Sequence, residues 1–317
     1  MQCRLPSTCV IITLYKIMSL IINKFGGGIM SSAKAIRHLP KTFEKHIHGN
    51  SMNVFSAFGK TTNNLEKILH NYASGDTNES SKIMHELKAF HLEIARDLFP
   101  EGHVTFGIIE DLFKKMQERL YLIGRGEDKK FIYDQIVPYG EILSSLVASE
   151  YLSHVGIKNK LVHATDFLKT DSNFNIANVD KKATNENLKV QIKEEIFITH
   201  KNIVTEGFIG FCEEGMTTLG REGSDYTAGI LGNLMNASKV VLWKDVPGVM
   251  DKNPKLAGNE NVQKIDFITY DDFEKHLEFN AVGLVHPKTL REVKEKKIPL
   301  QVRPFWDLES EGTLIHI

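Results

Sequence analysis

The sequence is poor in cysteine and has no long apolar run. Its three cysteines, Cys3, Cys9 and Cys212, have no metal-ligand spacing and cannot form a disulfide framework, which suits a reducing, cytoplasmic compartment. No stretch reaches the roughly 20 uninterrupted apolar residues of a membrane span. The formal net charge of −1 gives no global attraction to nucleic acid. These shortages point away from secreted, membrane and nucleic-acid-binding classes.

The first residues need a separate interpretation. Arg4 and the apolar stretch at 5–15 resemble the charged and apolar regions of a signal peptide, but Lys16 interrupts the run and no small-x-small cleavage site follows. From Met18 the chain reads as a buried strand that enters a glycine turn. We therefore expect residues 1–17 to be an extension outside the fold.

Short apolar runs alternate with amphipathic helices, the pattern of an α/β protein with a mainly parallel sheet. No internal repeat stands out, so we expect one continuous domain. Ligands of such sheets bind at the carboxyl ends of the strands. The expected strands are Leu20–Lys24, Met52–Ala57, Leu161–His163, Ile196–Ile198, Ile203–Phe208, Lys239–Trp243 and Pro299–Val302.

A long helical region lies between the second and third expected strands. Two apolar stripes at helical spacing predict core-facing helices, with a turn at 124–130 after the second. The stripes are Ile83, Leu87, Phe90, Ile94 and Leu98, and then Ile109, Leu112, Phe113, Met116 and Leu120.

The most informative segment is 217–228, Thr-Thr-Leu-Gly-Arg-Glu-Gly-Ser-Asp-Tyr-Thr-Ala. Its glycines let the main chain approach a ligand, and Arg221 offers a planar fork that fits a carboxylate or phosphate. An apolar-periodic helix follows, whose N-terminus attracts anions. By itself the segment is equally typical of a helix capped by Ser224 or Asp225.

Two other strand ends carry similar signals. Lys24 precedes Gly26, Gly27 and Gly28, so its ammonium could meet a phosphate held by backbone amides, although the spacing is not that of a P-loop. A tight turn with a solvated lysine fits equally. The segment 56–63, Ser-Ala-Phe-Gly-Lys-Thr-Thr-Asn, suits hydrogen bonding to a small polar ligand, or helix capping alone.

The remaining candidate segments are ambiguous one by one. Glu141, in Gly-Glu-Ile-Leu-Ser-Ser at 140–145, either pairs with a substrate ammonium or only favours the helix dipole. Asp245 lies in an Asp-x-Pro-Gly turn signature, beside Lys244. At the expected strand-to-helix junction 284–289, a lone histidine before proline, His286, is more typical of a helix cap than of a ligand.

Together these segments resemble the aspartate kinase family. The match runs from about Met18 to Ile317, and the ordered motifs leave little room for chance. They are Lys-Phe-Gly-Gly at 24–27, Ser-Ala-x-x-x-x-Thr-Asn at 56–63, Gly-Glu-x-Leu-Ser-Ser at 140–145, Gly-Phe-Ile-Gly at 207–210, Thr-Leu-Gly-Arg-x-Gly-Ser-Asp-Tyr at 218–226, Asp-Val-Pro-Gly-Val at 245–249 and a His-Pro turn at 285–287.

The resemblance implies a three-layer αβα sandwich with a lobe for the amino acid, about 18–215, and a lobe for ATP, about 216–317. It implies transfer of the γ-phosphoryl group of ATP, which carries Mg²⁺, to the side-chain carboxylate of L-aspartate, and it is compatible with a homodimer. It implies no metal held by side chains. The implied catalytic residues are Lys24 and Asp225, the substrate-binding residues are Thr62, Glu141, Arg221 and Ser224, and the ATP-binding residues are Lys24, Gly26, Gly27, Lys244, Asp245, Met250 and Lys255.

The sequence departs from the family pattern at four places. Gly28 replaces a serine or threonine and Glu222 replaces a glycine, while Met250 stands where an aromatic residue is common and Lys255 where arginine is. The resemblance also predicts that the kinase domain closes at Gly312 and that the ACT regulatory domains of the family are absent. Two alternatives stay open: a kinase of the same fold for another small acid, and a non-catalytic homologue.

Overall fold

The computed structural model describes residues 20–124, 126–192, 194–252, 261–279 and 283–317. The extension expected at 1–17 and the candidate residue Lys255 lie outside the described residues.

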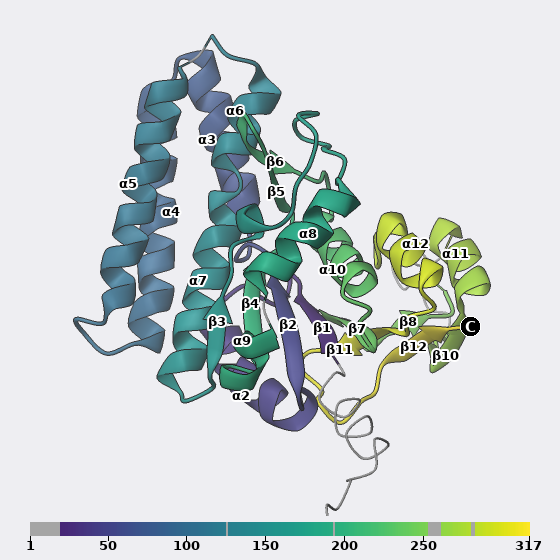
Figure 1. Cartoon of the computed structure of the whole chain (residues 1–317). Coiled ribbons are helices and arrows are strands. Elements are labelled where there is room, and N and C mark those ends of the chain that lie inside the picture. Colours follow the sequence, from purple (N-terminus) through teal and green to yellow (C-terminus); the bar gives the residue numbers. More distant parts are fainter. Residues whose placement is uncertain (1–19, 125, 193, 253–260, 280–282) are drawn as a thin grey trace, which may run out of the picture.

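An eight-stranded sheet runs through the middle of the molecule (Figure 1), in the order β10-β12-β11-β7-β1-β2-β4-β3. Neighbouring strands are parallel except β11 and β12, which pair antiparallel. Two separate hairpins, β5–β6 and β8–β9, complete the strands of the described residues. The strands are β1 (Leu20–Phe25), β2 (Asn50–Phe55), β3 (Asn159–Leu161), β4 (Asn202–Glu206), β5 (Ile209–Cys212), β6 (Gly215–Thr218), β7 (Lys239–Lys244), β8 (Val249–Met250), β9 (Lys264–Ile265), β10 (Phe267–Thr269), β11 (Leu300–Pro304) and β12 (Thr313–His316).

Helices cover both faces of the sheet, so the expected three-layer αβα sandwich is confirmed (Figure 1). One face carries α2 (Ala33–His46), α3 (Thr61–Ser74), α4 (Thr77–Leu98), α5 (Val104–Ile123), α6 (Lys129–Ile136) and α7 (Tyr139–His154). The other carries α8 (Lys181–Gln191), α9 (Glu194–Thr199), α10 (Gly223–Leu234), α11 (Tyr270–Phe279) and α12 (Pro287–Glu295).

Two hydrophobic cores follow from the alternation of side chains along the strands. In β7, Val240 and Leu242 belong to the core beneath α10 and α12, whereas Val241 and Trp243 belong to the core beneath α2 and α7. Because both faces are covered, most interior positions of the central strands are apolar or hydrogen-bonded; the buried hydroxyl of Thr205 in β4, which has no partner among the described residues, is an exception.

A row of buried polar side chains fixes the register of the central strands. Asn23 of β1 donates to Asn53 of β2 at 3.1 Å, and the indole of Trp243 donates to Asn23 at 3.1 Å. The Asn53 amide also reaches the carbonyl of Ile203 in β4, at 3.0 Å. A shift of one residue would leave these amides buried without partners, so the row specifies the pairing.

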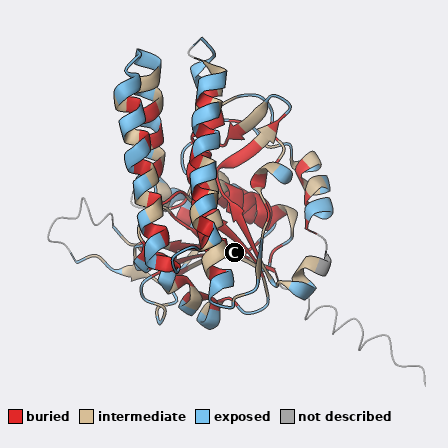
Figure 2. Cartoon of the chain, turned by 90° about the vertical axis from the view of Figure 1, so that its left-hand side faces the viewer, coloured by how far each residue is buried: buried red, intermediate tan, exposed pale blue. Residues whose placement is uncertain are grey.

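The two apolar stripes expected in the long helical region pack into the core, as predicted. Figure 2 shows the buried sides of the protruding α4 and α5, whose outer sides are exposed. The expected turn separates α5, which ends at Ile123, from α6, which begins at Lys129. None of the helices in the described ranges is both long enough and apolar enough to cross a bilayer.

The prediction of a strand at Ile196–Ile198 is wrong, because these residues lie in the short helix α9. Three apolar residues cannot distinguish helix from strand by periodicity, and Ile198 is 75% exposed. No strand precedes His286 within 283–286, which form a turn and bend into α12. The other expected strands form within a few residues of their predicted bounds, whereas β5, β6, β8, β9, β10 and β12 were not predicted.

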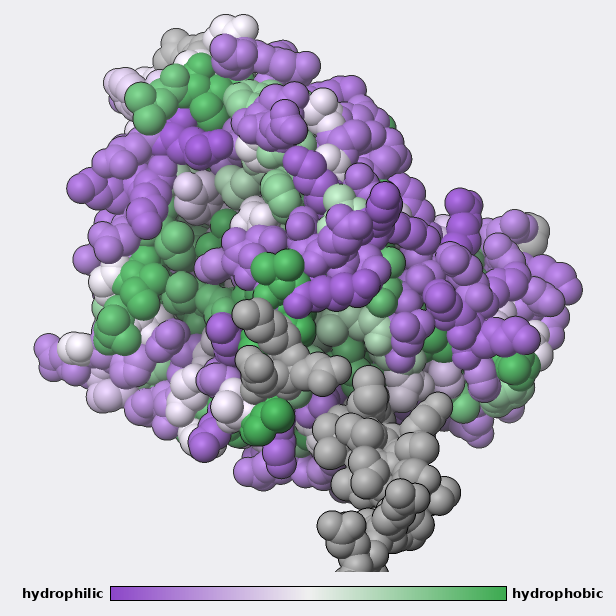
Figure 3. Space-filling view, viewed as in Figure 1, coloured by the Kyte–Doolittle hydropathy of each residue, from purple (hydrophilic) through white to green (hydrophobic). Residues whose placement is uncertain are grey.

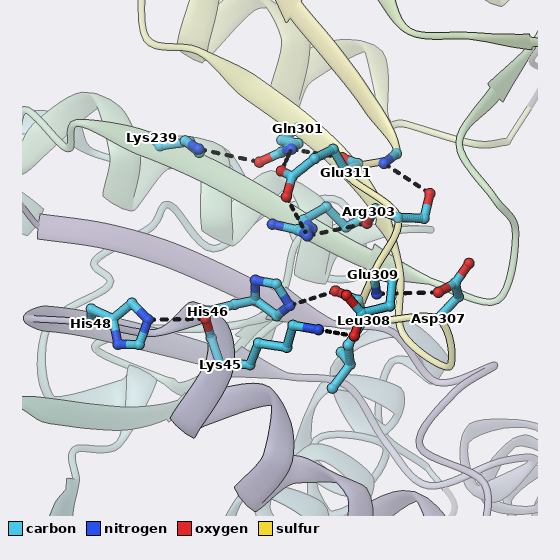
Figure 4. A network of polar contacts seen from close by, with 12 residues as sticks. Lys45, His46, His48, Lys239, Gln301, Arg303, Asp307, Leu308, Glu309 and Glu311 are labelled. Carbon is cyan, nitrogen blue, oxygen red and sulfur yellow. Dashed lines mark hydrogen bonds and ion pairs between the residues drawn. The ribbon is translucent and has the colours of Figure 1, made fainter.

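The connection between β11 and β12 is fastened to α2 by polar contacts (Figure 4). Lys45 pairs with Glu309, and the ring of His46 contacts the carbonyl of Leu308 at 2.8 Å. Arg303 donates to the Ser310 carbonyl at 3.1 Å and pairs with Glu311. The face of the molecule in Figure 3 is mostly hydrophilic, with apolar side chains gathered in one patch at the upper left and in a broader patch at the lower left.

Candidate functional site

The carboxyl ends of β1 and β7 meet the first turn of α10. Lys24 follows Ile22 on the α10 face of β1, and Lys244 follows Leu242 on the same face of β7. Alternation therefore aims both ammonium groups at the helix, where Asp225 lies. Three segments far apart in the sequence converge on one carboxylate.

Asp225 accepts an ion pair on each oxygen. The Nζ of Lys24 lies 2.6 Å from its Oδ1, and the Nζ of Lys244 lies 2.9 Å from its Oδ2. Burial alone would raise the pKa of Asp225, but the two lysines outweigh it and hold the pKa at about 2. Burial also lowers the pKa of Lys24, against the opposing effect of Asp225. Two cations share one anion, so the buried cluster carries an excess positive charge.

The start of α10 excludes the simple capping interpretation of its motif. The helix begins at Gly223, and its N-cap residue is Glu222, whose side chain makes no capping bond. Ser224 and Asp225 lie inside the first turn, both buried. Ser224 is pressed against Gly207, where an added Cβ would lie 2.4 Å from the Cβ of the serine. Gly207 is thus required by this close approach.

The glycine turn after β1 lines the same position. An added Cβ at Gly26 would lie 3.1 Å from the Lys24 ammonium, and one at Gly27 would lie 3.1 Å from the Ala57 carbonyl. Within the described residues the N–H groups of Gly27 and Gly28 donate to no protein group. These amides, beside a buried lysine, form a place for an anion.

Glu141 lies in the first turn of α7 and is 4% exposed. Burial raises the pKa of its carboxyl to about 8, against the effects of backbone hydrogen bonds and of Lys24. Its Oε2 has no hydrogen-bond partner among the described residues. A buried carboxyl oxygen without a donor is costly, and an ammonium group would satisfy it.

Neighbouring hydroxyl groups attach α7 to the strand ends. The Oγ of Ser144 donates to the Ser56 carbonyl at 2.7 Å, and the Oγ of Ser145 donates to Glu206 at 3.0 Å. The two serines of the Gly-Glu-Ile-Leu-Ser-Ser motif thereby fix Glu141 relative to β2 and β4. Thr62 lies half-buried in the first turn of α3, which begins at Thr61 after the Ser56 loop.

Arg221 is exposed at the loop between β6 and α10 and makes no hydrogen bond or ion pair with the described residues. Glu222 follows it with a left-handed φ of 56°, a conformation that glycine adopts without strain. This explains why the family pattern has glycine at the position of Glu222. Partial burial and the neighbouring Asp225 raise the pKa of the Glu222 carboxyl.

The segment after β7 lies beside this cluster. Asp245 is exposed, and an added Cβ at Gly28 would lie 3.4 Å from its Oδ2. Met250, in β8, is half-buried, and its carbonyl contacts the ring of His276 at 2.7 Å. His286 caps α12 by accepting from the Lys288 N–H at 3.1 Å, as expected from the sequence.

Two buried acids near the site escaped the sequence analysis. Asp134, in α6, accepts from the N–H of Thr218 at 2.8 Å, and Glu206, at the end of β4, accepts from the N–H of Ala164 at 2.8 Å and contacts His163 Nδ1 at 2.7 Å. Asp134 stands in no glycine-rich segment, whereas Glu206 directly precedes the Gly-Phe-Ile-Gly motif at 207–210 but was not singled out. The signal in the sequence that could have identified them as buried acids is a charged residue within an otherwise apolar run.

No group of three or more His, Cys, Asp or Glu side chains in the described part of the chain could hold a metal ion.

A model of the amino acid kinase family matches residues 19–304. The chain is 27% identical to aspartokinase 1 of the chloroplast of Arabidopsis thaliana, over 93% of this chain and 51% of that protein. It is 26% identical to the lysine-sensitive aspartokinase 3 of Escherichia coli K12, over 93% of this chain and 64% of that protein. The chain spans about half the length of aspartokinases 1 and 2 of Arabidopsis thaliana.

A solved structure of E. coli aspartokinase III, in complex with aspartate and ADP, aligns with a TM-score of 0.82 and 26% identity. The alignment covers 94% of this chain and 64% of that chain. A UMP kinase from Ureaplasma parvum, at 16% identity and a TM-score of 0.51, shares the fold.

Proposed function

We propose that this chain, which belongs to the amino acid kinase family, transfers the γ-phosphoryl group of ATP to the side-chain carboxylate of L-aspartate. The product is 4-phospho-L-aspartate. The observation that carries the proposal is the pairing of two lysines, the buried Lys24 and the half-buried Lys244, with the buried Asp225, beside the free amides of the glycine turn. The similarity to aspartokinases over nearly the whole chain supports aspartate as the acceptor.

This reaction needs charge neutralisation rather than a base. The side-chain carboxylate of free aspartate has a pKa of about 3.9, so the nucleophile is ionised at neutral pH. Catalysis then rests on aligning two anions and stabilising the charge of the transferring group. Lys24 lies where it can bind the γ-phosphoryl oxygens, with the amides of Gly26 and Gly27 beside it.

Asp225 orients the two lysines and takes no proton. A carboxyl with a pKa of about 2 is a poor base near pH 7. Its charge holds the lysines close together without cancelling both of their charges. The remaining positive charge is available to an incoming phosphate.

The amino acid would lie between α7 and the loop before α10. Arg221, which has no partner among the described residues, binds the α-carboxylate with its planar fork. Glu141 binds the α-ammonium through the oxygen that lacks a donor. Thr62 and Ser224 add hydrogen bonds from the first turns of their helices.

The nucleotide would lie along β7 and the segment after it. Lys244 contacts the phosphates, and Asp245 and Met250 surround the ribose and adenine. The family resemblance adds Lys255, which lies outside the described residues. The magnesium ion is carried by the phosphates of ATP. In this arrangement residues 18–215 supply most of the amino acid lobe and 216–317 the ATP lobe, with Arg221 and Ser224 reaching across.

The test is direct detection of the acyl phosphate. The purified protein is incubated with ATP, magnesium and L-aspartate, and the product is trapped with hydroxylamine as the hydroxamate. Glutamate and N-acetylglutamate serve as competing acceptors, and the Lys24→Ala variant serves as the blank. Aspartate-dependent hydroxamate that the variant does not form supports the proposal.

Other outcomes identify the alternatives. Hydroxamate with another acid in place of aspartate would make the chain a same-fold kinase of different specificity. No hydroxamate with any acid, while ATP still binds in calorimetry, would favour a non-catalytic homologue.

A further inference from the structure

We infer that Asp134 is a positioning residue that sets the aspartate affinity of the site, because its buried carboxylate fastens the strand that leads into the Arg221 loop. The inference rests on the proposed function. Asp134 is fully buried in α6, which lies beside the β5–β6 hairpin (Figure 1). It contacts no proposed substrate group itself.

Asp134 holds Thr218, the last residue of β6, at two points. Its Oδ2 accepts from the N–H of Thr218 at 2.8 Å, and its Oδ1 accepts from the Thr218 hydroxyl at 2.6 Å. The same Oδ2 accepts from the N–H of Asn175 at 2.8 Å. One carboxylate thus joins α6, β6 and the 173–177 loop.

The neighbouring residue strengthens the attachment. The amide of Gln135, also fully buried, donates to the Met216 carbonyl at 2.8 Å and accepts from the Met216 N–H at 3.3 Å. An added Cβ at Gly215 would lie 2.6 Å from the Oε1 of Gln135. Consecutive side chains of α6 therefore hold two alternate residues of β6.

Thr218 and the buried Leu219 are the anchored residues that precede Arg221. The carbonyl of Thr218 accepts from the N–H of Ala177 at 2.9 Å, so all polar groups of Thr218 are paired. Leu219 then bonds to the Phe208 carbonyl at 2.9 Å. Two residues later Arg221 stands exposed with no partner among the described residues. Because the guanidinium has no hydrogen bond or ion pair of its own, its position depends on the backbone on either side, which is held at Thr218 and Leu219 before it and by the bond from the Gly223 N–H to the Gly220 carbonyl around it. Asp134 contributes the Thr218 part of this attachment.

These contacts hold the Arg221 loop in one conformation before the substrate binds. A mobile loop would have to be ordered when the substrate carboxylate binds, and that cost would reduce affinity. Lys24, Lys244 and Asp225 are held by their own ion pairs. Loosening Thr218 should therefore weaken aspartate binding more than it slows phosphoryl transfer.

The experiment compares Asp134→Ala with Asp128→Ala. Asp128 is the N-cap of the same helix, where it accepts from the Lys130 N–H at 2.7 Å, and it does not contact β6. Both variants weaken α6, but only the first releases Thr218. We expect Asp134→Ala to raise the KM for aspartate about tenfold, with kcat within about threefold and the KM for ATP unchanged. Asp128→Ala should leave all three near wild type.

Two further variants keep the inference falsifiable. Asp134→Asn should restore much of the affinity, because its carbonyl oxygen can accept the two N–H groups and its amide can donate to the Thr218 hydroxyl. If Asp134→Ala does not fold, Thr218→Val removes only the hydroxyl bond and should raise the KM for aspartate in the same direction. An unchanged KM for aspartate in a folded Asp134→Ala, or equal increases in both alanine variants, would overturn the inference.

Hydrogen exchange separates this inference from the proposed function. In Asp134→Ala, but not in Asp128→Ala, the amides of 216–222 should exchange at least tenfold faster. If the wild-type protein does not phosphorylate aspartate, the proposed function fails while the exchange result still tests the attachment. If wild type is active and exchange at 216–222 is unaltered, Asp134 does not position the loop.

Discussion

Replacing Glu222 tests the backbone and the charge of the site together. Glu222 has a φ of 56° immediately before α10, and the left-handed conformation costs a residue with a Cβ roughly 1 to 2 kcal/mol. Glycine avoids this cost but gains freedom in the unfolded chain, worth roughly 0.5 to 1 kcal/mol. We therefore expect Glu222→Gly to be more stable than Glu222→Ala by about 1 kcal/mol, or roughly 2 °C in Tm for a domain of this size.

The charge of Glu222 acts separately. Its carboxylate is close enough to interact with Lys24 and Lys244, where the proposed phosphates bind. A unit charge about 10 Å from a phosphate oxygen, in an effective dielectric constant of about 40, costs roughly 0.8 kcal/mol, or about fourfold in affinity. Glu222→Gln and Glu222→Gly should both lower the KM for ATP by about this factor. The gain should shrink at high salt.

Three variants distinguish the two effects. Thermal unfolding compares Glu222→Gly with Glu222→Ala, which differ only in the Cβ, and steady-state kinetics compares Glu222→Gln with wild type, which differ mainly in charge. If the alanine variant is as stable as the glycine variant, residue 222 does not adopt a left-handed backbone conformation. If the glutamine variant binds ATP no better than wild type at low salt, the carboxylate does not face the nucleotide.

Four other changes have definite expected outcomes. Lys24→Ala should lower kcat by about 10²- to 10³-fold in the hydroxamate assay with the fold retained by circular dichroism, and near wild-type turnover would remove Lys24 from the site. Arg221→Lys should chiefly raise the KM for aspartate, because a point charge does not reproduce a bidentate contact; a change in the KM for ATP alone would contradict its assignment. Gly207→Ala should lower the free energy of unfolding, measured with denaturant, by roughly 1 to 3 kcal/mol, because the added Cβ would lie 2.4 Å from the Cβ of Ser224 in α10. The control Gly107→Ala, whose added Cβ would have no atom within 4 Å, should raise it by about 0.5 to 1 kcal/mol. The pKa of the Glu141 carboxyl is raised from 4.5 to about 8 in the folded protein, so its contribution to the free energy of unfolding should fall as pH rises from about 4.5 to 8, while kcat/KM for aspartate rises toward pH 8. Glu141→Gln should lose both pH dependences, and a Glu141→Gln variant that keeps the wild-type profiles would show that they do not come from Glu141.

The sheet could be predicted from the sequence where apolar runs were long and ended in glycine or hydroxyl residues. The strands at Leu20–Phe25 and Lys239–Lys244 formed as expected, because alternate side chains of each strand pack into the two cores on opposite faces of the sheet. The run at 196–198 was too short to decide between strand and helix, and it became α9. The hairpin β5–β6 was missed because its strands are only four residues long, and its two turn residues, Glu213 and Glu214, are not residues typical of a hairpin turn.

The candidate site could be predicted only in part, for a physical reason. Residues that lie at strand ends beside glycines, such as Lys24 and Arg221, give a local signal because backbone approach and charge occur together in the sequence. Asp134 gives no such signal, because its importance comes from donors that lie 41 and 84 residues away.

The pairing of Asp225 with two lysines leaves positive charge at the proposed phosphate site. Burial and the neighbouring Lys244 both lower the pKa of the Lys24 ammonium, whereas Asp225 opposes them. The carboxylate lies 2.6 Å from the Nζ of Lys24 and 2.9 Å from the Nζ of Lys244, so it offsets the repulsion between the two cations. A second carboxylate in equally close contact would leave no net charge for an anion. The Glu222 carboxylate interacts with the two lysines but forms no ion pair within the described residues. It therefore reduces the excess positive charge without cancelling it, and positive charge remains for the proposed phosphate.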